Sequence, residues 1–377
     1  MFTFNIKKDA VTYSLSELKR MKDEGVVPTE TLDALRREAD RMMAKPTVAV
    51  TRSRLRAPSG NPHDYTSMGP YWWPNPDTPD GLPYIRRDGQ FNPDSQDSKI
   101  FTEMFNIVKW CTLAAFYFDD DRYAERAVMA LYDWYINPET YMTPHARYAQ
   151  AIPGICDGRS IGLIDFRCSY EVMNSVRLLD AIGMIPPEYV GAIEKWYVDF
   201  TDWMLTSEIG LDEDIQHNNH GTWFDVQVLA AAIFTDRPAL ARKIITTAYP
   251  RRFTSQVRSD GSQPHELART QAMTYSFVNH LAYVNIAVMS ERLGDSRFFE
   301  CDAVAGDALI KLAVDYLYPY VKNPDTFPYQ QMHDMGKPTM AAYAYYAIKD
   351  RFPDTHCEER FKELADSSML FALIPAK

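Results

Sequence analysis

Long apolar runs are missing from this 377-residue sequence. A membrane-spanning helix needs about 20 consecutive apolar residues, and no stretch approaches that, so we expect no membrane partner. The segment Met1–Ala10 also lacks the charged start and apolar stretch of a secretory signal peptide. We therefore expect a periplasmic or secreted location if a signal peptide has been removed, and a cytoplasmic one if Met1 is the native start.

Cysteine is scarce: the chain has five cysteines and no CxxC pair. This pattern indicates neither a zinc ribbon nor a dense disulfide framework. Cys156 and Cys168 are the one pair close in sequence, and a bridge between them stays open. The odd total leaves at least one thiol free.

Basic residues are in deficit, with 40 Lys and Arg against 51 Asp and Glu and a formal net charge of -11. This argues against nucleic acid as a partner, because phosphate binding needs a basic face. It does not argue against a polyanionic substrate, because the field in a cleft depends on nearby charges. With 46% hydrophobic residues, the composition is typical of a folded globular protein.

Alternating strand patterns are also absent, and helical periodicity dominates. Ser14 and Glu17 have the spacing of a capping box that begins a helix. Further helices are predicted at residues 29–45, 98–118, 122–136, 169–180, 187–205, 222–234, 238–249, 274–293, 301–320 and 337–349. Because successive helices at short separation pack antiparallel, we expect an all-α ring of helical hairpins around a cleft, with at most a short strand or two in its loops.

Two segments, 56–94 and 146–167, break the helical pattern with many polar and aromatic residues. The first is far longer than the usual connection between packed helices. It is therefore interpreted as a lid or binding loop. The alternative is a surface loop packed by its own aromatic side chains.

The segment from His217 to Trp223 places four consecutive polar side chains directly before an apolar helix. A helix N-terminus suits an anion, because backbone N–H groups and the positive end of the helix dipole point there. The alternative is a plain capping turn with surface histidines.

Downstream, Arg269 and Tyr275 follow Glu266 at short spacing. Arg can hold a carboxylate with two hydrogen bonds, and Tyr can exchange a proton when cations are near. Taken by themselves, an arginine and a tyrosine at this spacing are more often a surface ion pair and a half-buried aromatic than a catalytic pair.

Four motifs occur together in order, and they resemble the alginate lyase superfamily. They are Asn61-Pro62-His63-Asp64-Tyr65, Gly69-Pro70-Tyr71-Trp72-Trp73-Pro74, Asn218-Asn219-His220-Gly221-Thr222-Trp223 and Glu266-Leu267-Ala268-Arg269…Tyr275. The resemblance is strongest to polysaccharide lyase family thirty-eight, and family five is more distant. It implies a single catalytic domain over residues 1–377, folded as an all-α incomplete (α/α) toroid of antiparallel hairpins with a lid loop at about 56–94.

The resemblance further implies a lyase that needs no metal or cofactor and cleaves a 1,4-linked uronate polymer, alginate or glucuronan, by β-elimination. Asn219, His220 and Arg269 match the residues that neutralise the substrate carboxylate, and Tyr275 matches the catalytic tyrosine. Segment 150–166 departs from family five, which leaves the preferred polymer open. The oligomeric state and the choice between endo and exo cleavage are open as well.

A chain of sugars needs flat apolar surfaces and cations, so further residues are candidates for substrate binding. They are Tyr65, Tyr71, Trp72, Trp73, Arg86, Arg87, Arg159, Asn218, Trp223 and His333. We expect about half of them to touch substrate. Of the adjacent tryptophans, we expect one to pack beneath its loop and one to face the groove.

Three other functions compete with the lyase. A glycoside hydrolase would use two carboxylates such as Asp157 and Asp225. A metal-dependent enzyme would draw ligands from His217 and His220 with Asp214 or Glu213, although their spacing is not that of a zinc helix motif. A non-catalytic glycan-binding protein is favoured only if Tyr275 lies far from Asn219 and His220.

Overall fold

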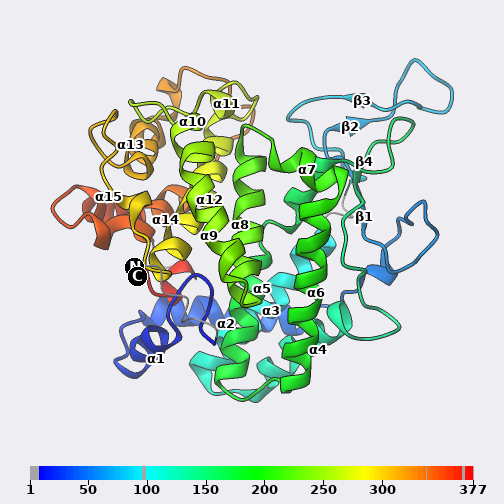
Figure 1. Cartoon of the computed structure of the whole chain (residues 1–377), viewed down its shortest axis with the longest axis horizontal. Helices are drawn as coiled ribbons and strands as arrows, with labels where there is room; N and C mark the ends of the chain where they lie inside the picture. Colours follow the sequence, from blue (N-terminus) through cyan, green and yellow to red (C-terminus); the bar gives the residue numbers. More distant parts are fainter. Residues whose placement is uncertain (1–7, 96–98, 337, 367–369, 377) are drawn as a thin grey trace. The chain divides into compact units, whose positions relative to one another are not determined.

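The computed structural model describes residues 8–95, 99–336, 338–366 and 370–376, and most of them are helical (Figure 1). The chain forms two compact units. One contains residues up to Leu35 together with Gln216–Lys377, and the other contains Arg36–Ile215. The expected single domain over residues 1–377 stays a prediction. Ser98 and Lys337, with which two predicted helices begin, lie outside the described residues.

The unit formed by Arg36–Ile215 is built on a helical hairpin. Its helices are α3 (Lys99–Phe118), α4 (Asp121–Tyr135), α5 (Ser169–Ala181), α6 (Pro187–Thr206) and α7 (Glu208–Asp214), and α3 packs against both α4 and α5. The Asp120 side chain caps α4 by accepting a hydrogen bond from the Arg122 backbone N–H. Phe166 joins the aromatic core, with its ring centroid 4.7 Å from that of Phe101 and 5.3 Å from that of Phe200.

The two loop segments expected at 56–94 and 146–167 contain short strands. Parallel β1 (Thr66–Met68) and β4 (Tyr148–Ala151) form one pair, and antiparallel β2 (Trp72–Trp73) and β3 (Ile85–Arg86) form the other. The half-buried Asp165, in the 3-10 helix Ser160–Phe166, connects these loops through its carboxylate. It accepts hydrogen bonds from Tyr65 (2.9 Å), Ser67 (2.7 Å) and Gln150 (3.0 Å).

The other unit begins with α1 (Leu15–Asp23), whose N-cap is Ser14 as predicted. It continues with α8 (Asn219–Phe234), α9 (Pro238–Ala248), α10 (Thr254–Gln256), α11 (Pro264–Leu267), α12 (Ala272–Arg292), α13 (Leu309–Lys322), α14 (Thr339–Ile348) and α15 (Cys357–Leu364). The helix α2 (Thr29–Met43) spans the division between the units. Helices α8 and α12 pack side by side and are buried along most of their lengths, as expected of inner helices (Figure 1).

The helix predicted at 301–320 begins eight residues later, at Leu309. Before it, the Asp302 carboxylate accepts hydrogen bonds from the backbone N–H groups of Val304 and Ala305 and forms a turn instead. Such side-chain bonds compete with helix formation, which periodicity does not reveal. The helices α7 and α15 were not predicted at all.

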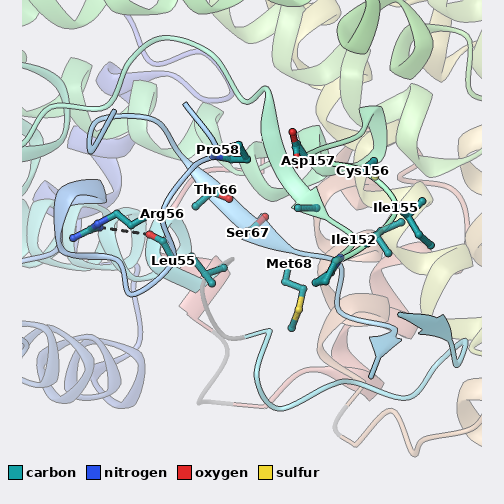
Figure 2. A pocket seen from close by; sticks show the side chains of 13 residues that line it. Leu55, Arg56, Pro58, Thr66, Ser67, Met68, Ile152, Ile155, Cys156 and Asp157 are labelled. Carbon is teal, nitrogen blue, oxygen red and sulfur yellow. Dashed lines mark hydrogen bonds between the residues drawn. The ribbon is translucent and has the colours of Figure 1, made fainter. Parts of the chain in front are cut away.

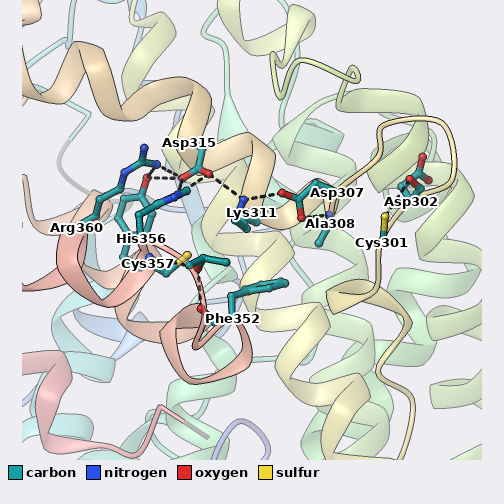
Figure 3. Close-up of polar contacts among 12 residues, drawn as sticks. Cys301, Asp302, Asp307, Ala308, Lys311, Asp315, Phe352, His356, Cys357 and Arg360 are labelled. Atoms are coloured by element: carbon teal, nitrogen blue, oxygen red, sulfur yellow. Dashed lines mark hydrogen bonds and ion pairs between the residues drawn. The ribbon is translucent and has the colours of Figure 1, made fainter.

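A polar network joins the last three helices (Figure 3). The Asp315 carboxylate of α13 accepts hydrogen bonds from Tyr345 (2.8 Å) of α14 and from Arg360 of α15, and pairs with His356 (2.8 Å). Lys311 lies between Asp315 and Asp307.

All five cysteines are free, so Cys156 and Cys168 are not bridged. Within the described residues, no helix is long and apolar enough to cross a membrane.

A buried ion pair fixes the chain where α8 begins. Arg252, 2% exposed, donates from Nε to the fully buried Asp225 carboxylate of α8 at 2.8 Å. Its Nη1 donates to the Gln216 carbonyl oxygen at 3.0 Å, in the turn that leads into α8. Gly221 lies against this arrangement: a Cβ there would be 2.2 Å from the Gln216 oxygen and 2.5 Å from Arg252 Nη1.

The space around Gly221 yields a stability prediction. Gly221→Ala should lower the free energy of unfolding by about 1–3 kcal/mol, because the added methyl group must displace a backbone oxygen and a buried guanidinium. The matched control is Gly191→Ala in α6, where a Cβ meets nothing within 4 Å. That change should raise stability by up to about 1 kcal/mol through helix propensity. Urea denaturation measures both, and equal effects would contradict this account.

The buried His280 of α12 yields a prediction for pH dependence. Its Nε2 donates to the Ile310 carbonyl at 2.7 Å, and burial lowers its pKa from 6.5 to about 4. Between about pH 6.5 and pH 4, His280 is therefore protonated in the unfolded chain but neutral in the folded chain. The free energy of unfolding consequently falls as the pH drops below about 6.5. This one group should cost about 2 kcal/mol between pH 7 and pH 5.

Urea denaturation at the two pH values tests this contribution. His280→Gln should remove it, whereas His265→Gln, at an exposed position, should keep the pH dependence of the unsubstituted chain. Retention of the full pH dependence in His280→Gln would show that other groups cause it.

Candidate active site

The N-terminus of α8 carries the first part of the predicted site. Asn218 is the N-cap, and its side-chain oxygen accepts a hydrogen bond from the His220 backbone N–H at 3.2 Å. Asn219 and His220 are the first two residues of the helix, where the helix dipole favours an anion. His220 is half-buried and reaches solvent, whereas Asn219 is 1% exposed.

Glu266, in the short helix α11, lies directly against Asn219. Its carboxylate accepts a hydrogen bond from the Asn219 backbone N–H at 2.5 Å, and Asn219 Nδ2 lies 3.1 and 2.9 Å from its two oxygens. Burial raises the pKa of Glu266, while the Asn219 hydrogen bonds and the charges of His220 and Arg269 oppose that rise. These contacts bring together groups 47 positions apart in sequence.

Arg269 and Tyr275 form the second part of the site. Cζ of Arg269 lies 4.0 Å from the centroid of the Tyr275 ring, a cation–π contact. Tyr275 lies in the first turn of α12, and both side chains are half-buried. The charge of Arg269 also acts on Glu266, as does that of His220. The four predicted catalytic residues therefore belong to one unit and are linked through Glu266 and the Arg269–Tyr275 contact.

The loop that carries His333 is hydrogen-bonded to the start of α12. The Ala272 backbone N–H donates to the Gln330 carbonyl and the Met332 N–H donates to the Thr270 carbonyl, both at 3.0 Å. The Gln331 side-chain oxygen accepts a hydrogen bond from the Met273 N–H at 3.0 Å. His333 is exposed on this loop, near the turn that bears Tyr275.

Several candidates for sugar binding lie around β2 in the other unit. Trp72 and Trp73 are both half-buried, and consecutive strand residues point to opposite faces. Arg159 lies 5.9 Å from the Trp72 ring centroid, and Arg87 lies 5.3 Å from that of Trp73. Tyr71 packs on a phenylalanine ring, and Arg86 is exposed and paired with an aspartate. Whether any of these residues binds sugar stays a prediction.

Gln150 holds Arg159 in place. Nε of Arg159 donates to the Gln150 carbonyl and Nη2 donates to the Gln150 side-chain oxygen, both at 3.0 Å. Gln150 has a positive φ of 49°, which is rare outside glycine. The Gln150 side chain also donates to the half-buried Asp165 at 3.0 Å, so the residue that holds the guanidinium is itself held in place.

Two of the sugar-binding candidates are corrected, because they lie in the core. Tyr65 is 1% exposed, and its hydroxyl donates to Asp165. Trp223 is 4% exposed, and its Nε1 donates to the Val278 carbonyl at 3.1 Å. Neither ring has a free face for a sugar. Motifs that mix polar and aromatic residues do not reveal which aromatics face inward.

The hydrolase alternative loses support from the same geometry. Asp225 is 0% exposed and paired with Arg252, so it has no access to a sugar and does not fit a hydrolase acid or base. Asp157 lines a different feature, a cavity of about 430 Å³ between the loops that carry β1 and β4 (Figure 2). None of the predicted catalytic residues lines that cavity. Within the described residues, no group of three or more His, Cys, Asp or Glu is arranged to hold a metal ion.

Sequence reasoning missed the role of Glu266. It stands in the motif that carries Arg269 and Tyr275, but its spacing alone gives it no partner. Only the fold shows that it meets Asn219. The one signal in the sequence was the position of Glu266, three residues before Arg269 in a segment whose pattern indicates a turn.

The predicted fold class, an all-α incomplete (α/α) toroid, is confirmed by solved structures of similar fold. An alginate lyase from Bacteroides ovatus is 32% identical, with a TM-score of 0.91, and the match covers 97% of this chain and 98% of that one. An alginate lyase A1-III variant complexed with tetrasaccharide is 16% identical, with a TM-score of 0.64, over 98% and 96% of the two chains.

The A1-III enzyme from Sphingomonas species A1, 15% identical with a TM-score of 0.57, matches over 93% of this chain and 97% of that one. At such low identity, the A1-III likeness shows the fold alone. Comparison with curated proteins finds no match. The family model described as alginate lyase, however, matches residues 50–327. Because that match spans most of the chain and the Bacteroides ovatus enzyme is alike over nearly all of it, this protein belongs to the alginate lyase family.

Proposed function

We propose that this chain is a polysaccharide lyase that cleaves a 1,4-linked uronate polymer, alginate or glucuronan, by β-elimination and leaves 4,5-unsaturated uronate ends. The observation that carries the proposal is the linked set of Asn219, His220, Arg269 and Tyr275 at the starts of α8 and α12. Membership of the alginate lyase family supports it, and so does the likeness to the alginate lyase from Bacteroides ovatus.

The chemical task of such a site is to make the C5 proton of a uronate removable. That proton is only weakly acidic unless the charge that builds on the neighbouring carboxylate is stabilised. Asn219, His220 and Arg269 supply donors and charge, and the α8 N-terminus adds its dipole. Each well-placed donor is worth about 3–4 kcal/mol of transition-state stabilisation, by analogy with oxyanion holes.

Tyr275 then transfers protons. In mannuronate and glucuronate, the C5 proton and the O4 leaving group lie on one face of the ring, so one tyrosine removes the first and protonates the second. Arg269, 4.0 Å from the ring centroid, stabilises the negative charge that develops on Tyr275 during this exchange. In guluronate the proton lies on the opposite face, and there His220 acts as the base and Tyr275 as the acid.

Substitutions of the two proton-transfer residues test the proposal. Tyr275→Phe should lower kcat by about 10³-fold or more on every substrate, because the leaving oxygen always needs its acid. His220→Gln keeps a hydrogen-bond donor but removes the base. It should therefore slow guluronate cleavage at least about 10-fold more than mannuronate or glucuronate cleavage. The assay is the appearance of ultraviolet-absorbing unsaturated ends from alginate blocks and from glucuronan.

The matched control is Tyr132→Phe, which removes a hydroxyl from a tyrosine stacked on Tyr189 in the other unit. It should retain full activity. If Tyr275→Phe is also fully active, the mechanism is wrong. If His220→Gln slows all substrates equally, His220 only binds the carboxylate.

A second prediction concerns metal dependence. Since Asn219, His220 and Arg269 already neutralise the carboxylate in this mechanism, no divalent cation is needed. Extensive dialysis against a chelator should leave kcat/KM unchanged within about twofold, as measured by the same assay. A loss of activity that one added divalent ion restores would overturn this prediction and would make the His217 and His220 segment a candidate ligand site.

A further inference from the structure

Glu266 presents an electrostatic problem for the site just described. A buried carboxylate, 1% exposed, contacts the very amide that is to hold the substrate carboxylate. If Glu266 stays ionised, a second negative charge comes close to it when a uronate binds, in a setting with little water to screen the two. Like charges at such short range disfavour each other strongly, and the enolate-like transition state makes the repulsion worse.

We propose that Glu266 takes up one proton from solvent when a uronate carboxylate binds, and that the resulting neutral acid turns the Asn219 amide so that its NH₂ group faces the substrate. The proposal rests on the proposed function, since it concerns the same site. Glu266 acts through Asn219 and is therefore a positioning residue.

The contacts define which oxygen takes the proton. Oε1 accepts the Asn219 backbone N–H at 2.5 Å, and a backbone N–H only donates, so Oε1 remains an acceptor. Oε2 lies 2.9 Å from the Asn219 side-chain amide, which can bind with either end. A proton on Oε2 is therefore donated to the amide oxygen once the amide has turned over.

Rotation of the Asn219 side-chain amide changes the number of N–H donors that Asn219 presents to a bound anion. With Glu266 ionised, the amide nitrogen faces Glu266, as the structure shows. The amide nitrogen is within hydrogen-bond distance of both Glu266 oxygens, so its donors are directed at Glu266 and its oxygen is the end that points away. With Glu266 protonated, the oxygen faces Glu266 and both hydrogens are left. Protonation thus removes a repulsive charge and adds a donor in the same step.

The groups around Glu266 determine whether it is ionised or protonated. Desolvation raises its pKa, and His220 and Arg269 lower it by their charges. Tyr283 on α12 interacts electrostatically with it and is fully buried. Arg252 forms its ion pair with Asp225 and not with Glu266. A bound uronate attracts His220 and Arg269 to its own carboxylate and adds a negative charge, and both effects favour protonated Glu266.

The experiment measures proton uptake on binding. A uronate trisaccharide is titrated by calorimetry into Tyr275→Phe, which should bind without cleaving, in buffers of different ionisation enthalpy at pH 7 to 8. The same titration is made with the Tyr275→Phe/Glu266→Gln double variant, whose glutamine mimics the neutral acid. We expect the double variant to take up at least about half a proton less and to bind as tightly or more tightly.

The matched control is Tyr275→Phe/Glu291→Gln. Glu291 lies near the other end of α12 and is paired with Arg351 at 2.6 Å, so this change removes the same charge away from the site. Its proton uptake should equal that of Tyr275→Phe. Unchanged uptake in the Glu266→Gln variant would overturn the proposal, because the proton would then go to a histidine. Binding weakened more than about 10-fold in that variant alone would also overturn it, because the negative charge would then be required.

A second measurement needs no change at Glu266. Infrared difference spectra of ¹³C-labelled Tyr275→Phe with unlabelled trisaccharide should gain a protonated carboxylic acid band that carries the isotope shift of the protein. Absence of that band overturns the proposal even if Glu266→Gln does not fold. If the unsubstituted chain cleaves uronates but neither signal appears, only this inference fails. If it neither binds nor cleaves any uronate, the proposed function fails with it.

Discussion

The buried pair of Arg252 and Asp225 is the interaction on which the site depends. Arg252 reaches from the segment after α9 to the first turns of α8 and also holds the Gln216 carbonyl before the helix. Removing one partner would leave an uncompensated charge in the core, so the pair holds as a unit. Because Gly221 leaves space for the guanidinium, the start of α8 is fixed in position, and with it Asn219 and His220.

A second layer of constraint comes from Glu266. It joins α11 to the start of α8, and the turn that follows α11 delivers Arg269 to the ring of Tyr275. The site thus lies at two helix N-termini: a buried polar contact with Glu266 holds the first, and the half-buried Arg269–Tyr275 pair lies at the second. Such contacts hold the helix starts in place, which is what preorganised stabilisation of a carboxylate requires.

Local signals in the sequence predicted the helices well where nothing competed with periodicity. The capping box at Ser14 and the span of α6 are examples. The prediction failed at 301–308, where the Asp302 side chain forms a turn with backbone N–H groups. It also failed for Tyr65 and Trp223, since a motif records which residues are neighbours in sequence but not which face of the fold they occupy.

The sequence by itself determined the class of fold, the family and the four residues proposed for catalysis, because helical periodicity and ordered motifs are local properties of a chain. Only the tertiary structure decided that Glu266 contacts Asn219, that Asp225 is closed off by Arg252, and that Gln150 holds Arg159. Each of these contacts joins residues separated along the chain, by 47, 27 and 9 positions. Which partner a buried charge or amide finds depends on how helices and loops pack, and no local pattern encodes that choice.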